Sequence, residues 1–377
     1  MLKNYVKIAF RNLRNSRGFT AINIVGLAIG MAAAMLIMLW VNFQLGFNKN
    51  FSKTDQLYIV GSKAKADDKI AVWFASPKPL AAVLKSDIAE AKNVTRLSGT
   101  NGYLFDLGDK KVPAGVGAFV DSAFLNMFDY ELISGNRDNA LKGPQNIVLT
   151  DELAKNLFGT VDAIGKTIRI DSTNLLNVSA VIKVESPNHI FKGYEYYMPW
   201  TLMEKLGYSD NQWNNSSVDL YVELEKNANL DKIQKQISDI MPRHSDNDTE
   251  AFLKPYGDLY LYNKYENGIL VGGRIDMVNT FIIVAVLILL IACINFMNLC
   301  TAQSEKRAKE VGIRKVVGAR KKSIIFQFLS ESLILSTISG ILALFIVSLT
   351  LSSFNDLVGF KFNIPTHDIR FWGLFGG

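Results

Sequence analysis

The chain has 377 residues, of which 49% are hydrophobic, and its mean hydropathy is +0.14. These values indicate that part of the chain lies in lipid. The net charge of +6 is modest, and the cations gather beside the apolar runs, which favours a role in membrane orientation over binding of nucleic acid. Cys293 and Cys300 fall in one apolar run, about 10 Å apart along a helix, too far for a disulfide within it. The three histidines lack metal-ligand spacing, so we predict no metal site.

At the amino terminus, residues 1–17 combine apolar and basic positions at helical spacing, which predicts a cytoplasmic amphipathic helix at the membrane interface. The apolar run 18–45 is long enough to cross the membrane. Within it Gly26, Gly30 and Ala34 recur every four residues, and small residues at this spacing allow another helix to pack closely, although Gly and Ala are common in spans. The alternative is a cleaved signal peptide, which the length of the run and the lack of a small-x-small site disfavour.

Residues 46–277 have the composition of a soluble mixed domain, which the basic residues before the first span place outside the cytoplasm. Strand-like stretches alternate with short helices, so we predict a large α+β domain with a second lobe inserted over residues 117–215. Thr150 or Asp151 is the expected cap of one helix. The predicted strands cover residues 56–61, 112–120, 146–149, 167–170, 177–184 and 218–224, and the predicted helices cover residues 79–91, 122–128, 151–157 and 231–241.

The segment GTVDAIGKT, from Gly159 to Thr167, resembles a nucleotide-binding P-loop but has five residues where that motif requires four. We interpret Gly159 and Gly165 as turn residues between a helix and a strand. No nucleophile elbow, paired metal-ligand motif or dinucleotide loop is present. The sequence therefore predicts no catalytic residues and no enzymatic activity, although a triad assembled in space would leave no such motif.

The second span is predicted over residues 278–303. Asn295 and Asn298 lie three residues apart on one face of it. Amides at such positions in lipid usually form hydrogen bonds with a neighbouring helix, and contact with a substrate is the alternative.

The third span is predicted over residues 323–351, with Gln327 and Glu331 on one face near its cytoplasmic end. A carboxylate there should face a partner or water, either in a static interhelical bond or in an ion pair that changes during a conformational cycle. Residues 352–370 are expected to form an extracytoplasmic loop, and residues 371–377 resemble the start of a fourth span. We therefore expect an α-helical bundle of three complete spans and a truncated fourth, in a fragment of a longer protein.

The loop 304–322 lies between the second and third spans and carries eight Lys and Arg residues, so the positive-inside rule places it in the cytoplasm. Its sequence EKRAKEVGIRKVVGA, from Glu305 to Ala319, resembles the signature of the MacB/FtsX family of ABC-transporter permeases. Supporting similarities are FRNLRNSRGFTAINIVGLAIG near the amino terminus, ACINFMNLCTA in the second span and QFLSESL in the third. LFGTVDAIGKTI also resembles a recurring feature of the family's periplasmic core domain.

The resemblance implies a first permease half with a MacB-like periplasmic core domain and no cofactor of its own. ATP and Mg²⁺ would bind a partner ATPase, and the cytoplasmic loop would pass its motion to the external domain. Apolar loop residues would fill a groove on the ATPase and charged ones would contact its rim, whereas setting topology at lipid headgroups is the alternative role of the cations. The residues implied in coupling are Glu310, Val311, Gly312, Ile313, Arg314, Lys315, Val316, Val317, Gly318 and Ala319.

The resemblance also implies a bacterial plasma (inner) membrane protein whose partners are an ABC ATPase, a second permease half or a second copy, membrane lipids and an envelope protein. The expected function is export or extraction of a lipoprotein, a peptide or a small toxic compound. One alternative is a non-transporting transmitter that regulates envelope or cell-wall enzymes. Another is a membrane-anchored binding domain without an ATPase.

Overall fold

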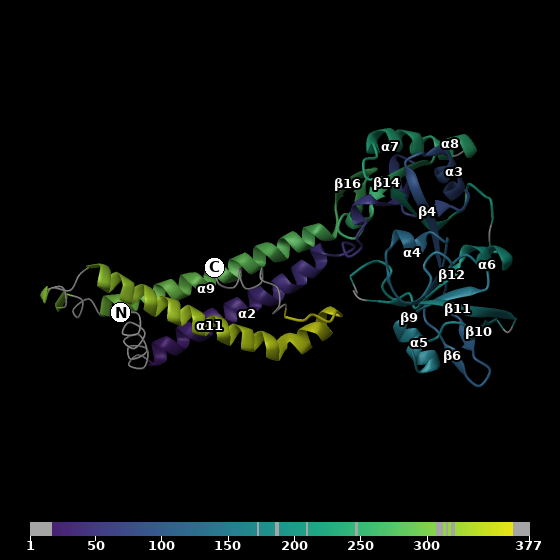
Figure 1. Cartoon of the computed structure of the whole chain (residues 1–377). Coiled ribbons are helices and arrows are strands. Elements are labelled where there is room, and N and C mark those ends of the chain that lie inside the picture. Colours follow the sequence, from purple (N-terminus) through teal and green to yellow (C-terminus); the bar gives the residue numbers. More distant parts are fainter. Residues whose placement is uncertain are drawn as a thin grey trace. The chain divides into compact units, whose positions relative to one another are not determined.

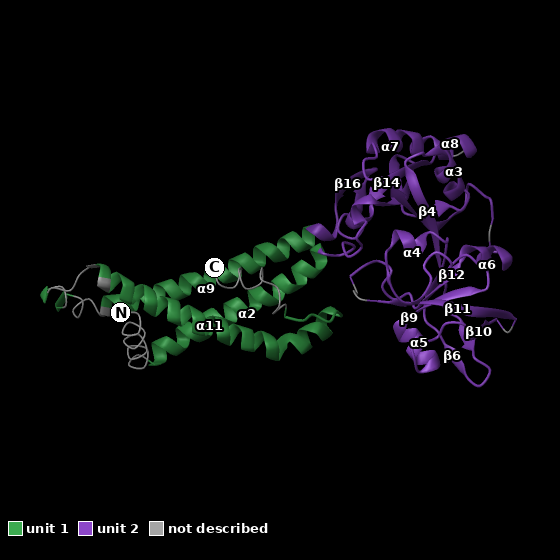
Figure 2. Cartoon of the chain, viewed as in Figure 1, with its two compact units in different colours: residues 1–45, 276–377 green, residues 46–275 purple. Residues whose placement is uncertain are grey.

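A computed structural model describes residues 17–364 except 172, 185–187, 209, 246–247, 307–311, 314–315 and 318–320. The chain divides into two compact units (Figure 2). We call residues 1–45 with 276–377 the membrane unit, and residues 46–275 the sheet unit. Except for Arg17, the predicted interfacial helix lies outside the described residues, as does the predicted start of a fourth span.

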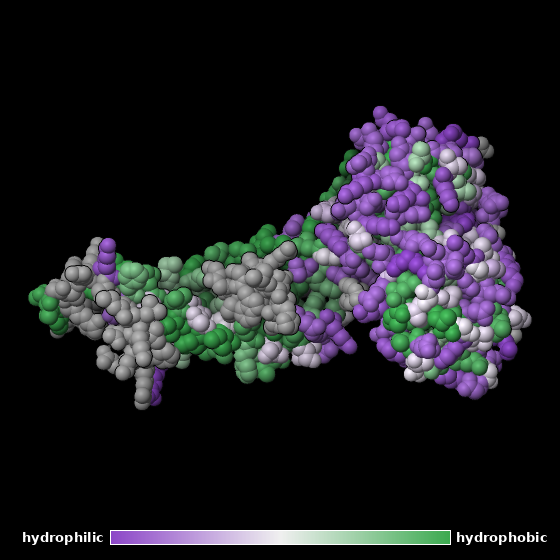
Figure 3. All heavy atoms as spheres, viewed as in Figure 1, coloured by the Kyte–Doolittle hydropathy of each residue, from purple (hydrophilic) through white to green (hydrophobic). Residues whose placement is uncertain are grey.

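Three long helices are each apolar and long enough to cross a membrane: α2 (Arg17–Leu45), α9 (Arg274–Lys306) and α11 (Lys321–Val358) (Figure 1). Their surface is mostly hydrophobic, whereas that of the sheet unit is mostly hydrophilic (Figure 3). The three predicted spans are therefore present as helices. The loop prediction was wrong for residues 352–358, because α11 continues through them.

Helices α2 and α11 pack along each other through small side chains. Ala28 and Ala32 of α2 are buried against Ala343 and Val347 of α11. Small residues bring two helix backbones close together, which increases van der Waals contact where lipid gives no hydrophobic driving force for association.

The sheet unit contains a 14-stranded mixed sheet whose central path runs β14-β1-β13-β4-β7-β12-β9-β11-β10-β5-β6. β2 pairs with β1, β3 with β13 and β8 with β11, and a separate hairpin joins β15 to β16. The strands are β1 (Leu57–Ala66), β2 (Lys69–Trp73), β3 (Ser76–Pro77), β4 (Ala91–Gly99), β5 (Leu104–Asp106), β6 (Lys111–Pro113), β7 (Gly117–Val120), β8 (Glu131–Gly135), β9 (Asn146–Thr150), β10 (Thr167–Ile170), β11 (Asn174–Lys183), β12 (Tyr196–Pro199), β13 (Ser216–Leu224), β14 (Glu250–Pro255), β15 (Lys264–Glu266) and β16 (Ile269–Gly272).

Short helices complete this α+β fold, as predicted. They are α3 (Leu80–Asp87), α4 (Phe124–Met127), α5 (Asp151–Phe158), α6 (Trp200–Lys205), α7 (Leu230–Ser238), α8 (Ile240–His244), and the 3₁₀ turns η1 (Thr54–Gln56) and η2 (Tyr256–Asp258). The side chain of Thr150 caps α5 by accepting a hydrogen bond of 3.3 Å from the Leu153 N–H. Gly159, with φ of 73°, ends the helix in the left-handed region, and Gly165 has φ of 75°. The interpretation of these two glycines as turn residues is confirmed.

The sheet unit contains an inserted portion, but it begins earlier than residue 117. β4 and β13 pair directly, so the chain between them leaves the first half of the sheet and returns to it. β5 and β6 precede residue 117 yet extend the far edge of the sheet, because β5 pairs with β10. We define the inserted portion as residues 100–215. It forms one half of the sheet, and the rest of the sheet unit forms the first half.

Three hydrophobic clusters form the core. One lies in the first half of the sheet with α3, α7 and α8, and one lies in the inserted portion with α5 and α6. The third joins the two halves and is rich in aromatic rings, among them Phe51, Phe128, Phe191, Tyr221 and Tyr256. Phe51 belongs to the segment directly after α2, so this cluster places that segment within the core of the sheet unit.

Candidate functional site

The segment 46–56, which leaves α2, is fixed to the sheet unit within three residues of the helix end. Asn48 is fully buried, and its backbone N–H donates to the Asn188 carbonyl at 2.8 Å. Its amide donates to the Tyr256 carbonyl at 3.2 Å and accepts from the Ile190 N–H at 2.9 Å. The backbone φ of 61° is one that Asn tolerates better than most side chains. Asn48 therefore ties the chain to the inserted portion and to η2 at once.

Phe51 inserts into the aromatic cluster between the two halves of the sheet. Its ring centroid lies 5.3 Å from that of Phe128, 5.4 Å from Tyr130, 5.5 Å from His189 and 6.0 Å from Tyr256. Tilted and edge-on contacts at such distances are favourable for aromatic rings. Displacement of this segment would therefore disturb packing in both halves.

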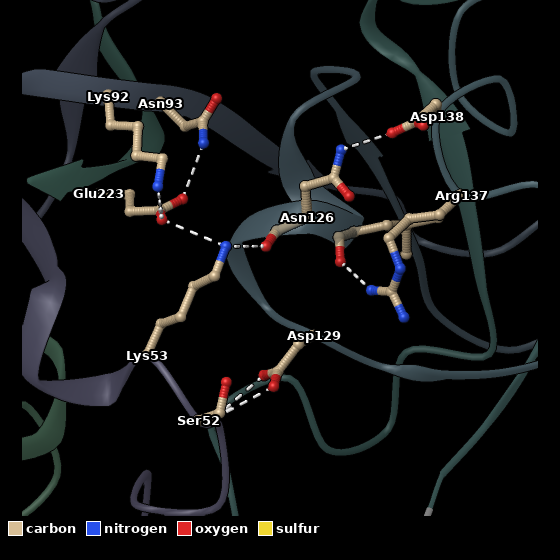
Figure 4. A network of polar contacts seen from close by, with 10 residues as sticks. Ser52, Lys53, Lys92, Asn93, Asn126, Asp129, Arg137, Asp138 and Glu223 are labelled. Carbon is tan, nitrogen blue, oxygen red and sulfur yellow. Dashed lines mark hydrogen bonds and ion pairs between the residues drawn. The ribbon is translucent and has the colours of Figure 1, made fainter.

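Lys53 joins the two halves through polar contacts (Figure 4). Its ammonium donates to the Asn126 carbonyl at 2.7 Å and lies 3.1 Å from Glu223 Oε1. The Glu223 side chain is fully buried on β13, and it also accepts from the Asn93 amide at 2.7 Å and lies 3.7 Å from the Lys92 ammonium. A buried carboxylate needs such cations and donors, since an unpaired one would be strongly destabilising.

Further hydrogen bonds hold the loop that follows α4. The Ser52 N–H donates to the Asp129 carboxylate at 3.2 Å (Figure 4). The Arg137 guanidinium donates to the carbonyls of Leu125 and Tyr130, each at 2.5 Å. The whole segment from Asn48 to Lys53 is thus held by hydrogen bonds and packing, and we call it the anchor.

The chain that leaves the sheet unit meets the chain that enters it at Tyr260. The Phe47 ring stacks on the Tyr260 ring with centroids 3.6 Å apart and an angle of 15°. The Arg274 guanidinium, at the first residue of α9, lies 4.6 Å from the same ring centroid and donates to the Tyr260 hydroxyl at 3.0 Å. The Ile275 N–H donates to the Leu261 carbonyl at 3.0 Å. We call Phe47, Tyr260 and Arg274 the Tyr260 clasp.

The anchor and the clasp were not among the residues singled out from the sequence. The available signal was the concentration of aromatic and basic residues just outside the ends of the first two spans, as in NFQLGFNKNF and DLYLYN. Such residues are common at membrane interfaces, so the sequence gives no reason to pair Phe47 with Tyr260 across more than 200 residues.

In the membrane unit, the predicted helix-packing residues are in different environments. Gly30 faces α9 so closely that an added Cβ would lie 2.5 Å from the Ala292 Cβ. Gly26 is exposed, and no described residue lies within 4 Å of an added Cβ, whereas Ala34 is half-buried. Close packing on α2 in this chain is therefore carried by Gly30 with Ala28 and Ala32.

The four polar residues predicted within the spans also differ in how far they are buried. Asn295 and Asn298 are exposed on α9, and neither side chain forms a hydrogen bond with another described residue. Gln327 is half-buried, and Glu331 is buried with 6% of its surface exposed. Hydrogen bonding of the two asparagines to another helix stays a prediction.

Of the ten residues implied in ATPase coupling, the structure describes Gly312, Ile313, Val316 and Val317. The Val317 N–H donates to the Ile313 carbonyl at 3.1 Å, which forms a helical turn. Ile313 is 60% exposed, Val316 89% and Val317 82%. The turn therefore presents apolar side chains to its surroundings. Glu310, Val311, Arg314, Lys315, Gly318 and Ala319 lie outside the described residues.

Two charged side chains in the sheet unit have strongly perturbed pKa values. Burial raises the pKa of Asp219 to about 6, and the Tyr221 hydroxyl offsets part of that shift by hydrogen bonding to the carboxylate. Burial lowers the pKa of Lys254 to about 8, with Asp258 partly opposing the shift. The Lys254 ammonium donates to the Tyr265 hydroxyl at 2.8 Å. Among the described residues, no three His, Cys, Asp or Glu side chains are grouped to hold a metal ion.

Comparison with known proteins gives matches over both units. The family model for the MacB-like periplasmic core domain matches residues 20–240, and the model for the FtsX-like permease C-terminal region matches residues 282–377. The periplasmic region of MacB from Actinobacillus actinomycetemcomitans is similar in structure, with a TM-score of 0.41 and 13% identity over 57% of this chain and 92% of that one.

Two relatives differ in how much of their length this chain covers. The macrolide export ATP-binding/permease protein MacB of Pasteurella multocida is 26% identical over 264 residues, which are 67% of this chain but 38% of that protein. The ABC transporter permease YvrN of Bacillus subtilis is 22% identical over 360 residues, 90% of this chain and 84% of that protein. Because the core-domain model alone matches more than half of the sequence, the chain belongs to the MacB/FtsX family of ABC-transporter permeases.

Proposed function

We propose that this chain is the permease subunit of an ABC transporter in the plasma (inner) membrane of a bacterium. The amino terminus and the loop 304–322 lie in the cytoplasm, and the sheet unit lies outside. A partner ATPase binds ATP and Mg²⁺, and its motion reaches the sheet unit through α2 and α9. Membership of the family supports this assignment, as does the charge of the loop.

The observation that carries the proposal is the Tyr260 clasp together with the anchor. Both covalent connections between the two units pass through these residues, and Asn48, Phe51 and Lys53 contact both halves of the sheet. We propose that a displacement of α2 or α9 acts on the junction of the two halves through these residues. Packed cores have discrete arrangements, so such a displacement favours a change in how the halves pack.

On the cytoplasmic side, we propose that the turn containing Ile313, Val316 and Val317 docks in a groove of the ATPase. Its exposed apolar side chains support this role, since apolar groups form the buried centre of protein interfaces. The exposed Asn295 and Asn298 on α9 support a second permease half or a second copy as the neighbour in the membrane.

We further propose that the moving sheet unit acts on cargo outside the membrane, for export or extraction of a lipoprotein, a peptide or a small toxic compound. Macrolide export is the activity in the name of the Pasteurella relative.

Copurification tests the proposal. The native chain, solubilised in detergent from its host, should retain an ATPase identified by mass spectrometry. Gly312→Pro combined with Arg314→Glu should release that ATPase, because the proline disrupts the turn and the glutamate reverses a rim charge. Lys110→Glu, on the exposed β5–β6 turn of the sheet unit, is the control for charge reversal and should retain it. Absence of any ATPase from the native chain, or equal retention by all three chains, would refute coupling.

A further inference from the structure

The β15–β16 hairpin, residues 264–272, stands apart from the main sheet and leads directly into α9. Its strands form a separate two-stranded sheet. Both residues of its turn, Asn267 with φ of 49° and Gly268 with φ of 77°, are left-handed, as a tight two-residue hairpin turn requires. The hairpin ends two residues before Arg274, which is the first residue of α9 and belongs to the Tyr260 clasp. Whatever the hairpin contacts therefore braces the start of α9.

The turn of the hairpin is fastened to β2. The Ile70 N–H donates to the Asn267 amide oxygen at 2.9 Å, and an added Cβ on Gly268 would lie 2.9 Å from Ile70 Cγ2. At the α9 end, Gly273 has φ of 146°, and a Cβ there would lie 2.7 Å from the Leu261 carbonyl oxygen, so this position requires glycine. The hairpin is thus held at its turn and joined to α9 through a residue with wide backbone freedom.

Lys254 of β14 fastens the first strand of the hairpin. Its ammonium donates to the Tyr265 hydroxyl at 2.8 Å, and it lies 5.0 Å from the centroid of the same ring and 5.7 Å from that of Phe74. The Phe252 ring lies 6.2 Å from the Tyr265 ring and 5.8 Å from the Phe74 ring. In the part of the chain that the structure describes, no carboxylate forms an ion pair with Lys254.

Burial of this charge without an opposite charge beside it is costly. Lys254 is 4% exposed, and a neutral hydroxyl with ring faces replaces less of its hydration than a carboxylate would. The pKa of about 8, against an ordinary 10.5, reflects that cost, and Asp258 of η2 is the charged group that partly offsets it. On the β1 side the residue paired with Lys254 is the uncharged Ile59. Opening of the hairpin returns the ammonium to water, so the charge favours opening.

From these contacts we propose that the hairpin 264–272 is a releasable strap, which braces the start of α9 against β2 and β14 when closed and lets it pivot when open. Lys254 keeps the strap releasable, because its buried charge offsets part of the stabilisation that the rings and hydrogen bonds provide. The link to motion of α9 rests on the proposed function, whereas the effect of Lys254 on the hairpin is a property of this chain alone.

Lys254→Met tests the role of the charge, because methionine keeps a long apolar side chain against the rings and carries no charge. In the full chain in detergent at pH 7, amides of residues 264–272 should exchange hydrogen about 3- to 30-fold more slowly than in the native chain. A lysine that only fastened the hairpin would give the opposite change on removal. Lys69→Met removes an exposed lysine from the neighbouring β2 and is the matched control, whose hairpin exchange should stay within about two-fold of native.

The pH dependence of the native chain gives a second measurement. Protection is the intrinsic exchange rate divided by the measured rate at the same pH. In the hairpin it should rise about ten-fold between pH 7 and pH 9, because the closed form loses the Lys254 proton in that range and the open form keeps it. Lys254→Met should show no such rise. Amides of β4 and β13 report whether each variant has kept its core.

Slower hairpin exchange in Lys254→Met, together with the rise in protection in the native chain, supports the strap. Faster or unchanged exchange in Lys254→Met with the core amides intact would overturn it, as would constant protection of the native hairpin between the two pH values. If Lys254→Met lost its core protection, the pH dependence of the native chain would decide. The measurement involves no partner and copurification tests the permease assignment separately, so either proposal can fail without the other.

Discussion

Two carboxylates on β13 show how local environment decides the effect of a charge. Glu223 is fully buried with Lys53, Lys92 and Asn93 around it, so its charge is compensated. Asp219 is half-buried, with a hydrogen bond to the Tyr221 hydroxyl but without an ion pair in the described part of the chain. We expect the first to stabilise the junction of the two halves and the second to destabilise it when ionised.

Asp219 makes stability depend on pH. Its pKa is about 6 in the folded chain against an ordinary 3.8, so between these values the folded state binds more protons than the unfolded state. Through this group the free energy of unfolding therefore rises as the pH falls from 7 to 5, by about 1 kcal/mol. Asp219→Asn lacks this dependence. Denaturant unfolding of both chains should show their difference in stability changing by that amount between the two pH values, and a constant difference would contradict it.

Lys53 and Lys92 contact the same carboxylate but should differ in their contribution. Lys53→Met leaves Glu223 with the Lys92 ammonium at 3.7 Å and the Asn93 amide at 2.7 Å, and we expect a loss of about 1–3 kcal/mol in the free energy of unfolding. Lys92 is the more exposed of the two, with 48% of its side chain accessible against 30%, so Lys92→Met should cost about 1 kcal/mol or less. Urea unfolding of the two variants measures this, and equal losses would show that Lys53 has no special role.

At the scale of elements, periodicity predicted the three spans and the strands in the middle of the sheet. It failed where contacts with distant segments determine the course of the backbone. Residues 112–120 were predicted as one strand, yet they form β6 at the far edge and β7 at the centre. The chain bends between them because Ala114 donates to the Tyr103 carbonyl and Gly115 to the Glu195 carboxylate. These contacts come from distant segments, and no local pattern encodes them.

The candidate site was predictable to a lesser degree. The loop 304–322 and Glu331 were singled out because charge inside or beside an apolar run can be read from the sequence alone. The Tyr260 clasp depends on two rings that approach only after the whole sheet has formed. Gly30 could be named from its spacing, but Gly26 has the same spacing and no neighbour among the described residues. The sequence alone therefore does not tell which of the two glycines packs against another helix.

The packing of α2 on α9 provides a matched pair of substitutions. Gly30→Val would force a side chain into the space of Ala292, and overpacking of this kind costs about 1–3 kcal/mol. Gly26→Val places the same side chain where nothing lies within 4 Å. Thermal unfolding in detergent should show a clear loss for Gly30→Val and little for Gly26→Val. Similar losses would mean that another subunit covers Gly26.

The Tyr260 clasp should control local opening where the two ends of the sheet unit meet, which we call its base. Tyr260→Ala removes the stack on Phe47 and the contact with Arg274, so amides in residues 47–53 and 261–275 should exchange hydrogen about 5- to 100-fold faster. Tyr260→Phe keeps the ring and loses only one hydrogen bond, so its exchange should stay within about five-fold of the native chain. Unchanged exchange in Tyr260→Ala would show that the anchor alone holds the base.

On the scale of the whole molecule, the sheet unit is inserted between two spans and both of its ends are tied to each other. Its three clusters give it a core of its own, and its contacts at Phe47 and Arg274 lie within the unit. Residues 46–275 expressed alone should therefore fold cooperatively. Circular dichroism should show a cooperative thermal transition, and hydrogen exchange should give the same protection of β1, β13 and β14 as in the full chain. A molten product would contradict this.

The pairing of β1 with β14 has a consequence for biogenesis. Tyr58 pairs with Pro255, and Asn48 donates to the carbonyl of Tyr256, so the first and last parts of the sheet unit are joined to each other. In the proposed topology, the inserted portion can fold outside the cytoplasm while synthesis continues, but the pairing of β1 with β14 must wait for residue 256 to emerge. Only 18 residues later α9 begins. The segment that ties the sheet unit to α2 therefore closes last, almost together with the insertion of the second span.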